Sequence, residues 1–224
     1  MRLYDCELTF HDNLYYETRT LGRLYETGRL LHNIALCYAL GFAQTTYHHA
    51  IDVPQYGTEL ASLNEAGVYV TPAGGEHISY VVHTFKFGGE RTSVRMERSN
   101  ANIPTFGRAK EIAVNSRFRF GVLSEQRLTF PQWVRMGLWM SKARLRVLEI
   151  PLTSAGAGEH TVALYPLNPL DLPGNAELNL FDLVSMRPSS LVENALIDAD
   201  EWWQGQHPDR GRFYLPANMR HNVE

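Results

Sequence analysis

Residues 1–10, MRLYDCELTF, alternate between apolar and polar side chains, and this stretch decides the fold. In an extended chain the apolar residues share one side and the polar residues share the other: Tyr4, Cys6, Leu8 and Phe10 against Asp5, Glu7 and Thr9. A period of two residues is typical of a strand with one buried face. The chain is therefore predicted to open with a half-buried β-strand.

Two later segments repeat this alternation with arginine on the polar side. Residues 117–123 alternate arginine with phenylalanine and valine, and residues 143–150 alternate arginine with leucine and valine. Both segments are predicted to be strands with one apolar and one cationic face.

A helix is predicted over residues 28–40, on the chain that follows the first strand. Thr27 suits the N-cap of this helix, and Gly41 suits the position just after its C-terminus. Residues 68–71 are predicted to form a short strand.

A β-hairpin is predicted where residues 78–87 and 92–98 flank Gly88 and Gly89. Residues 99–116 are rich in turn formers. After residue 151, Pro, Gly and Asn punctuate the chain and predict long connections. Three short apolar segments in this part are expected to be strand or helix: 178–186, 191–197 and 213–215. Together these elements predict an antiparallel α+β domain with a projecting hairpin.

The net charge of −3 conceals a strong asymmetry along the chain. Residues 1–85 carry a net −5, residues 86–146 a net +9, and residues 147–224 a net −7. A concentrated cationic stretch between acidic flanks is expected of a molecule that binds a polyanion and stays soluble. Of the 21 cations 18 are arginine, which suits phosphate binding, although a GC-rich genome would produce the same bias.

Several classes of protein are disfavoured by what the sequence lacks. Asp5 and Glu7 stand where a signal peptide needs an apolar run, and the apolar part of residues 30–51 is too short to span a bilayer, so a cytoplasmic protein without a membrane partner is expected. Cys6 and Cys37 match no metal or disulfide pattern and are predicted to be core thiols. Dinucleotide, phosphate-loop, hydrolase and zinc-protease motifs are absent, so no cofactor, no metal ion and no catalytic residue is predicted.

Two local features leave alternatives open. The adjacent His48 and His49 could ligate a metal ion or act as acid and base, but no carboxylate cluster is near them in the sequence. The tandem Trp202 and Trp203 could form a partner-binding patch or anchor the core.

Residues 100–110, NANIPTFGRAK, combine groups that suit a bent single strand of nucleic acid. Amides can bind base edges, Phe106 can stack, Gly107 permits close approach of the backbone, and the cations can bind phosphates. The alternative is an ordinary surface loop followed by a helix that starts at Arg108.

Four separated segments resemble one known family, in the same order. They are RLYDCELTFHDNL (residues 2–14), GRLYETGRLLHNIALCYALG (22–41), IPTFGRAKEI (103–112) and WVRMGLWMSKARLRV (133–147). The chain is similar to the type I-D CRISPR-associated subunit of the Cas-five group, the Csc-one family. The likeness covers most of residues 1–150.

The resemblance implies a fold and a domain organisation. Residues 1–150 would form a ferredoxin-like (RRM-like) RAMP core with an antiparallel sheet and an inserted thumb hairpin at about 78–98. Residues 151–224 would form an irregular, strand- and loop-rich C-terminal extension packed on the core. The glycine-rich loop that the broader superfamily carries near its C-terminus is missing, so a second ferredoxin-like half is not expected.

The resemblance also implies a function, that of a non-catalytic Cascade subunit in antiviral defence. It would cap the 5′ handle of the crRNA, contact the backbone subunit and the large subunit, and lie near target double-stranded DNA beside the protospacer-adjacent motif (PAM). The residues expected to bind RNA are Lys86, Arg91, Arg95, Arg98, Asn100, Asn102, Phe106, Gly107, Arg108, Lys110, Arg117, Arg119, Lys142, Arg144 and Arg146.

Two other functions stay open at this stage. A metal-independent endoribonuclease that processes precursor crRNA would use Tyr15, Tyr16, His48 and His49 as acid and base groups. A small-molecule α+β enzyme would need a narrow ligand pocket.

Overall fold

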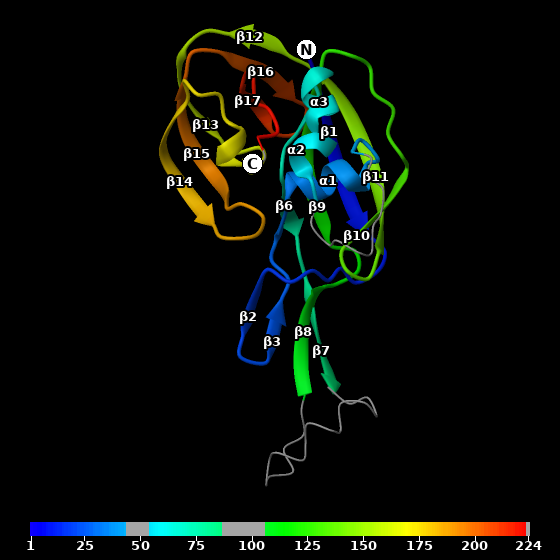
Figure 1. The fold of residues 1–224 in the computed structure, drawn as a ribbon. Helices are drawn as coiled ribbons and strands as arrows, with labels where there is room; N and C mark the ends of the chain where they lie inside the picture. Colours follow the sequence, from blue (N-terminus) through cyan, green and yellow to red (C-terminus); the bar gives the residue numbers. More distant parts are fainter. Residues whose placement is uncertain (44–53, 87–105, 223–224) are drawn as a thin grey trace.

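The computed structural model describes residues 1–43, 54–86 and 106–222. Most of this part of the chain is β-structure (Figure 1). Its strands are β1 (Arg2–Phe10), β2 (Arg19–Leu21), β3 (Leu24–Glu26), β4 (Leu30–Leu31), β5 (Tyr69–Val70), β6 (Ala73–His77), β7 (Tyr80–Lys86), β8 (Phe106–Ile112), β9 (Arg117–Ser124), β10 (Trp133–Met136), β11 (Ser141–Pro151), β12 (Thr153–Ala155), β13 (Gly158–Val162), β14 (Glu177–Val184), β15 (Leu191–Ala199), β16 (Trp202–His207) and β17 (Gly211–Pro216).

The helices of the described chain are short. They are α1 (Asn33–Ala39), α2 (Tyr56–Glu59), α3 (Ala61–Glu65) and a 3₁₀ turn at Pro169–Asp171. The α+β expectation is therefore correct only in coarse outline, since strands outweigh helices in the described residues. None of these helices is long and apolar enough to cross a membrane.

A seven-stranded antiparallel sheet forms the centre of the molecule. Its order is β10-β11-β1-β9-β6-β4, and β5 also pairs with β9. The predicted opening strand is β1, and the two predicted arginine-faced strands are β9 and β11, which pair with β1 on either side. The alternation thus predicted which side chains share a face in all three strands, although Val147, on the apolar side of β11, is 39% exposed.

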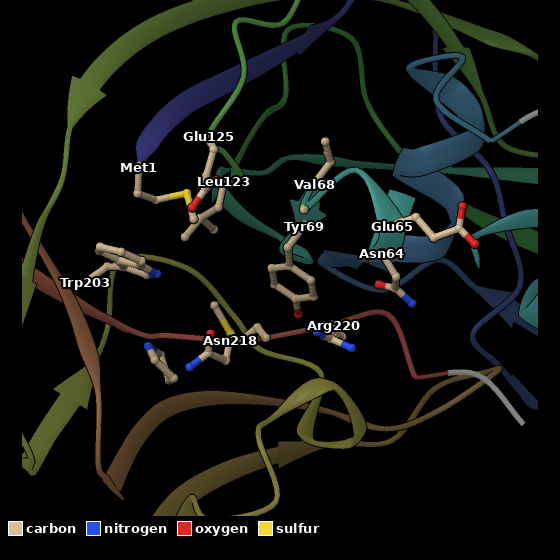
Figure 2. Close-up of a pocket in the computed structure, with 13 residues that line it drawn as sticks. Met1, Asn64, Glu65, Val68, Tyr69, Leu123, Glu125, Trp203, Asn218 and Arg220 are labelled. Atoms are coloured by element: carbon tan, nitrogen blue, oxygen red, sulfur yellow. The ribbon is translucent and has the colours of Figure 1, made fainter. Parts of the chain in front are cut away.

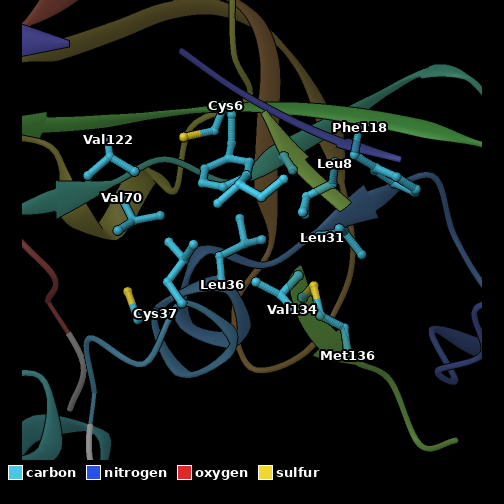
Figure 3. Packing of buried hydrophobic residues seen from close by; sticks show 14 of the residues in the cluster. Cys6, Leu8, Leu31, Leu36, Cys37, Val70, Phe118, Val122, Val134 and Met136 are labelled. Carbon is cyan, nitrogen blue, oxygen red and sulfur yellow. The ribbon is translucent and has the colours of Figure 1, made fainter. Parts of the chain in front are cut away.

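The inner face of this sheet is covered by helices. The apolar side of β1 packs with Phe118 and Val122 of β9 against Leu36 and Cys37 of α1 (Figure 3). Cys6 and Cys37 are both buried free thiols, as predicted.

The predicted helix at residues 28–40 is shorter than expected. Leu30 and Leu31 form β4 and pair with β6, because that pairing completes the sheet edge. The helix starts at Asn33, and the His32 ring, not Thr27, caps it by accepting a hydrogen bond from the Ile34 amide (3.3 Å). After the helix ends, Gly41 adopts a positive φ of 74°, in keeping with its predicted place.

A second sheet, β2-β3-β8-β7, extends away from the body at its lower end in Figure 1; we call it the projecting sheet. The first predicted hairpin arm is β7, but its partner in the described chain is β8, so Lys86 lies opposite Phe106. The predicted return strand at 92–98 and the Gly88-Gly89 turn lie outside the described residues. Residues 106–112 are a strand, so the alternative of a helix starting at Arg108 is wrong.

The C-terminal third forms two three-stranded sheets, β12-β16-β17 and β13-β15-β14. The three apolar segments expected there as strand or helix belong to β14, β15 and β17. Apolar residues of β15 and β17 belong to a second hydrophobic cluster, which includes Leu3, Leu123 and Ile150 from the outer face of the central sheet. Of β14, Leu178 packs against this cluster, while Leu180, Phe181 and Leu183 are exposed. Trp202 is fully buried in this cluster, and its indole N–H donates to the carbonyl of Gly158 (2.9 Å).

Candidate nucleic-acid interface

The outer face of the central sheet has a covered half and an open half. On the covered half, Leu3, Leu123 and Ile150 are buried under the C-terminal sheets. On the other half, outward side chains of β9, β10 and β11 reach solvent; we call this half the open face. The predicted RNA-binding residues Arg117, Arg119, Lys142, Arg144 and Arg146 all lie on the outer side of these strands.

The strand register sets these residues in rows across the open face. Trp133 pairs with Arg144, Arg144 with Thr9, Thr9 with Arg117, and Arg117 with His77. Paired residues point to the same side of a sheet, so this row runs across five strands. A second row holds Arg146, Glu7 and Arg119.

Glu7 is the acidic centre of the arginine cluster. Its carboxylate lies 3.8 Å from the Arg117 guanidinium, 3.7 Å from that of Arg119 and 4.0 Å from that of Arg146. Arg119 has further carboxylate partners, so the positive charge that this cluster offers to solvent lies on Arg117 and Arg146, whose side chains are 41% and 69% exposed. The exposed Arg135 and Arg144 add to this positive charge at the edge of the sheet.

Arg119 differs from the other cations because its side chain is only 15% exposed. Its guanidinium is bonded to Asp5 and, at 2.7 Å, to Glu76. Asp5 also accepts from Tyr165 (2.8 Å) and contacts His207 (3.2 Å). The guanidinium of Arg119 is thus committed to partners within the protein, and its contact with RNA stays a prediction.

The projecting sheet carries a second group of predicted residues. Phe106, Arg108 and Lys110 alternate along β8 and share one face. Arg23 lies 5.1 Å and Arg108 6.0 Å from the Phe106 ring centroid, within the range of cation–π attraction. On the same face the Lys110 ammonium lies 4.2 Å from the ring centroid of Tyr80.

Lys110 also contacts Glu26, at 3.2 Å. The Arg19 and Lys110 side chains hold the pKa of the Glu26 carboxyl below its usual range, Arg19 having the larger effect. Lys110 is therefore partly neutralised, whereas Arg108 is exposed beside Phe106.

Gly107 lies on the opposite face of β8 from these cations. A Cβ atom there would approach Phe85 to 2.6 Å and Tyr25 to 3.1 Å, so the glycine makes room for two aromatic rings. Its predicted role, close approach of the backbone to RNA, stays a prediction. Five predicted residues lie outside the described residues: Arg91, Arg95, Arg98, Asn100 and Asn102. Lys86 ends β7.

Sequence reasoning missed several residues of these surfaces. Trp133 and Arg135 alternate with the buried Val134 and Met136, so the period of two in this short strand could have placed them outward. Arg23 and Tyr80 carried no such signal, because their contacts depend on the pairing of distant strands.

The candidate acid–base residues occupy structural positions where they are described. The Tyr16 hydroxyl donates to the carbonyls of Gly28 (2.8 Å) and Leu30 (2.5 Å), and burial raises its pKa above the usual range. Tyr15 stacks on Trp139 with ring centroids 4.7 Å apart. His48 and His49 lie outside the described residues.

A pocket of about 320 Å³ lies between the start of β1, β5 and the C-terminal segment, beside Tyr69, Trp203 and Arg220 (Figure 2). Behind it Tyr69 donates to the buried Asp171 (3.0 Å), which also accepts from Asn33 (2.7 Å). Burial raises the pKa of Asp171 to about 6, with these hydrogen bonds opposing the shift.

The thiol of Cys37 lies 3.6 Å from the His221 ring, near the same pocket. Burial raises the pKa of this thiol, which makes it a poor nucleophile. His221 accepts from the Val70 amide (3.3 Å), so the pair ties the C-terminal segment to β5. Among residues 1–43, 54–86 and 106–222, no cluster of three His, Cys, Asp or Glu side chains could hold a metal ion.

Comparison with known proteins gives a family and several structural likenesses. No curated protein matches the chain. A chain in the cryo-EM structure of the Type III-B Cmr-beta bound to cognate target RNA and AMPPnP is similar over 87% of this chain and 86% of that one, with 9% identity and a TM-score of 0.48. A CRISPR protein from Archaeoglobus fulgidus is similar over 98% of this chain and all of that one, with 11% identity and a TM-score of 0.41.

The family assignment rests on the sequence. The profile of the family described as type I-D CRISPR-associated protein Cas5/Csc1 matches residues 1–224. The match spans the strands of the open face, the projecting sheet and the C-terminal sheets, and it agrees with the resemblance carried by the four segments. The chain belongs to the type I-D CRISPR-associated Cas5/Csc1 family.

Proposed function

We propose that this CRISPR effector subunit is a non-catalytic RNA-binding protein that caps the 5′ handle of the crRNA in a type I-D Cascade complex. Family membership and the concentrated positive charge of residues 86–146 support this proposal. In guide complexes base pairing reads the target, so a subunit of this kind needs only to hold the RNA backbone and a short fixed sequence.

The observation that carries the proposal is the row of cations on the open face. Arg117 and Arg144 come from segments far apart in the sequence. Both pair with Thr9, so they lie in one row on either side of it. Two arginines that face the same way across a sheet suit the phosphates of a single strand.

The projecting sheet is proposed to be the thumb of a ferredoxin-like core. In support, the strands β11-β1-β9-β5 lie in that order and all pair antiparallel, and α1 connects β1 to the later strands. A ferredoxin-like unit has the chain order β-α-β-β-α-β. Here the segment with β10 takes the place of the second helix, between β9 and β11.

The RNA-binding proposal is tested by paired substitutions. Arg117→Ala with Arg144→Ala is expected to weaken binding of guide RNA and to reduce the slope of log affinity against log salt by about 1 to 2. Arg212→Ala, an exposed arginine on β17, is the matched control. If the double variant had the same affinity and the same salt slope as the parent protein, the open face would not be part of the RNA site.

The handle-capping role needs a second test. Arg108→Ala and Lys110→Ala, on the projecting sheet, are expected to lower assembly onto guide RNA that carries the 5′ handle more than onto RNA that lacks it. A loss of the same size on both RNAs would show general phosphate binding and no preference for the handle.

The partners of the complex belong to the same proposal. We expect contacts with the backbone subunit and the large subunit, a place near the PAM of the target DNA, and function in the cytoplasm. Crosslinking within the assembled effector would identify the neighbouring subunits and the DNA segment, and crosslinks confined to the distal end of the guide would contradict this placement.

The absence of catalysis is also a proposal, and an endoribonuclease is the second candidate. The position of Tyr16 disfavours a nuclease, because its hydroxyl group is hydrogen-bonded to two backbone carbonyls and its pKa is raised by burial. Incubation with precursor crRNA in a metal chelator decides the matter: intact RNA is expected, and a defined cut lost in Tyr15→Phe or His49→Ala would establish the nuclease.

A further inference from the structure

We infer that Trp133 is a stacking platform for one unpaired base of the RNA held on the open face. This inference rests on the proposed RNA-binding function and adds to it a residue and a mode of contact. It is drawn from the place of Trp133 in β10, its exposure and its contact with Lys142.

Trp133 stands at the edge of the central sheet. β10 is the last strand of the order, and its side chains alternate between buried Val134 and Met136 and exposed Trp133 and Arg135. Trp133 is 41% exposed, whereas Trp202 in the core is fully buried. A large ring left in solvent among cations suits a flat ligand that carries negative charge.

The ring is held in place by two basic neighbours. The Lys142 ammonium lies 4.0 Å from its centroid, and the His11 ring lies at 5.0 Å with its plane tilted by 70°. The His11 amide also donates to the Lys142 carbonyl (2.9 Å), which fixes both residues beside β10. A preorganised indole loses little entropy when a base stacks on it.

The same arrangement provides for the phosphate of the stacked nucleotide. Lys142 covers part of the indole, and its ammonium retains hydrogens that can bond to a phosphate oxygen. Arg144 pairs directly with Trp133, so a second cation lies next to the ring. A nucleotide could therefore stack its base on the indole and place its phosphate between Lys142 and Arg144.

Trp139 provides a matched control on the neighbouring turn. It is 55% exposed, but its neighbours Leu138 and Met140 are exposed apolar residues and its ring stacks on Tyr15. Apolar surroundings of this kind suit contact with a protein. The two tryptophans are therefore similar in exposure and different in the chemistry around them.

The experiment compares the parent protein with Trp133→Leu, Trp133→Phe and Trp139→Leu. The probes are a single-stranded oligouridylate of about ten nucleotides, the matching oligothymidylate, and inorganic polyphosphate, which has charge without bases. Binding is followed by anisotropy of a labelled oligomer, by competition with polyphosphate, and by quenching of tryptophan emission.

We expect oligouridylate to quench the parent and polyphosphate to bind without quenching. Trp133→Leu should lose about tenfold in affinity for oligouridylate and most of the quenching, while its affinity for polyphosphate is unchanged. Trp133→Phe should stay within about threefold of the parent, since phenylalanine keeps a stacking face. Trp139→Leu should match the parent.

Each other outcome is decisive. If Trp133→Leu binds oligouridylate as the parent does, the platform is refuted and the RNA-binding function stands. If Trp133→Leu also loses affinity for polyphosphate, the substitution has disturbed the sheet. The platform then stands if Trp133→Phe binds oligouridylate within about threefold of the parent and is refuted if it does not. If Trp139→Leu loses as much as Trp133→Leu, the assignment to Trp133 is overturned. Tighter binding of oligothymidylate than oligouridylate refutes the RNA assignment, and a parent that binds neither polymer refutes the proposed function itself.

Discussion

At the scale of single residues, Arg119 shows how a cation predicted for a ligand can be required by the fold. It extends from β9 to Asp5 of β1 and Glu76 of β6, and Asp5 in turn bonds to Tyr165 and His207. The alternation in residues 117–123 placed Arg119 on the correct face. The carboxylates that meet it come from distant segments, so the sequence could not distinguish a buried arginine from an exposed one.

Replacing Arg119 tests this structural role. Arg119→Ala is expected to lower the free energy of unfolding by about 3 kcal/mol, because the carboxylate of Asp5 would stay buried without its cation. Urea denaturation measures the change. The control is Arg146→Ala, whose side chain is 69% exposed and which should cost less than about 1 kcal/mol. Equal losses in the two variants would contradict a special role for Arg119.

Two buried histidines and one buried aspartate couple stability to pH. Burial lowers the pKa of both His32 and His221 to about 4 and raises the pKa of Asp171 to about 6. Between pH 6.5 and 4 the unfolded chain therefore binds more protons at these histidines than the folded chain does. Their contribution to the free energy of unfolding is complete above pH 6.5 and is lost as the pH falls toward 4. Asp171 acts in the opposite sense, since its contribution is lost as the pH rises through about 6.

Replacing His32 separates its part of this pH dependence. His32→Asn removes the titrating ring and keeps a residue that caps helices well. The difference in unfolding free energy between pH 7 and pH 4.5 should shrink by about 2 kcal/mol, because one proton-linked loss is removed. Urea denaturation at both pH values measures it. An unchanged difference would show that His32 does not carry the acid sensitivity.

At the scale of elements, periodicity predicted strands better than it predicted the helix. Residues 4–10, 117–120 and 143–146 of β1, β9 and β11 alternate between apolar and polar side chains, so in these stretches the pattern alone predicts both the strand and its inward face. The apolar residues at 30 and 31 fit a helical face equally well, but they form β4 because β6 offers a pairing edge. The hairpin was harder to predict, because each residue of β7 pairs with a residue of β8 that follows it by 20 or more positions in the sequence.

Gly107 is a tightly packed position of the projecting sheet. Gly107→Val is expected to push Phe85 and Tyr25 apart and to loosen the pairing of β7 with β8. Hydrogen exchange at the amides of β8 should speed up, while the global unfolding free energy changes little because Phe85 and Tyr25 belong to neither hydrophobic cluster.

The control for this prediction is Gly156→Ala. No heavy atom lies within 4 Å of the Cβ position there, so exchange in β8 should stay at the parent rate. Unchanged exchange in Gly107→Val would mean that the two rings rearrange without cost to the pairing.

At the scale of the whole molecule, the C-terminal third has two separate relations to the core. Its buried apolar residues cover half of the outer face of the central sheet, whereas its exposed residues include both acidic side chains, such as Asp198, and apolar ones, such as Leu180 and Leu183. The sequence predicted the acidic charge and the short strands of this third. It could not predict which half of the sheet would be covered, because that depends on how two sheets pack and not on any local pattern.

One acidic row of the C-terminal sheets is open to a direct test. Glu159, Asp198 and Glu177 are paired across β13, β15 and β14, so three like charges stand side by side. Asp198→Asn is expected to raise the melting temperature of the isolated chain slightly at low salt, since opposed like charges destabilise a sheet.

The same variant should assemble less well if the row binds basic neighbours in the effector complex, and the assembled fraction on guide RNA measures this. Asp209→Asn, outside the row, is the control. A variant that melts no higher and assembles as well as the parent would remove any role for the row in either property.

The register of the central sheet also limits which changes in chain length the protein can accept. Arg144 and Arg146 face the same way because they lie two residues apart along β11, and Leu145 between them faces inward. Inserting one residue inside this strand would turn leucine to solvent and arginine into the core. Insertions and deletions should therefore be tolerated at the 137–140 turn, outside the paired ladder, and should be lethal to folding only a few residues later.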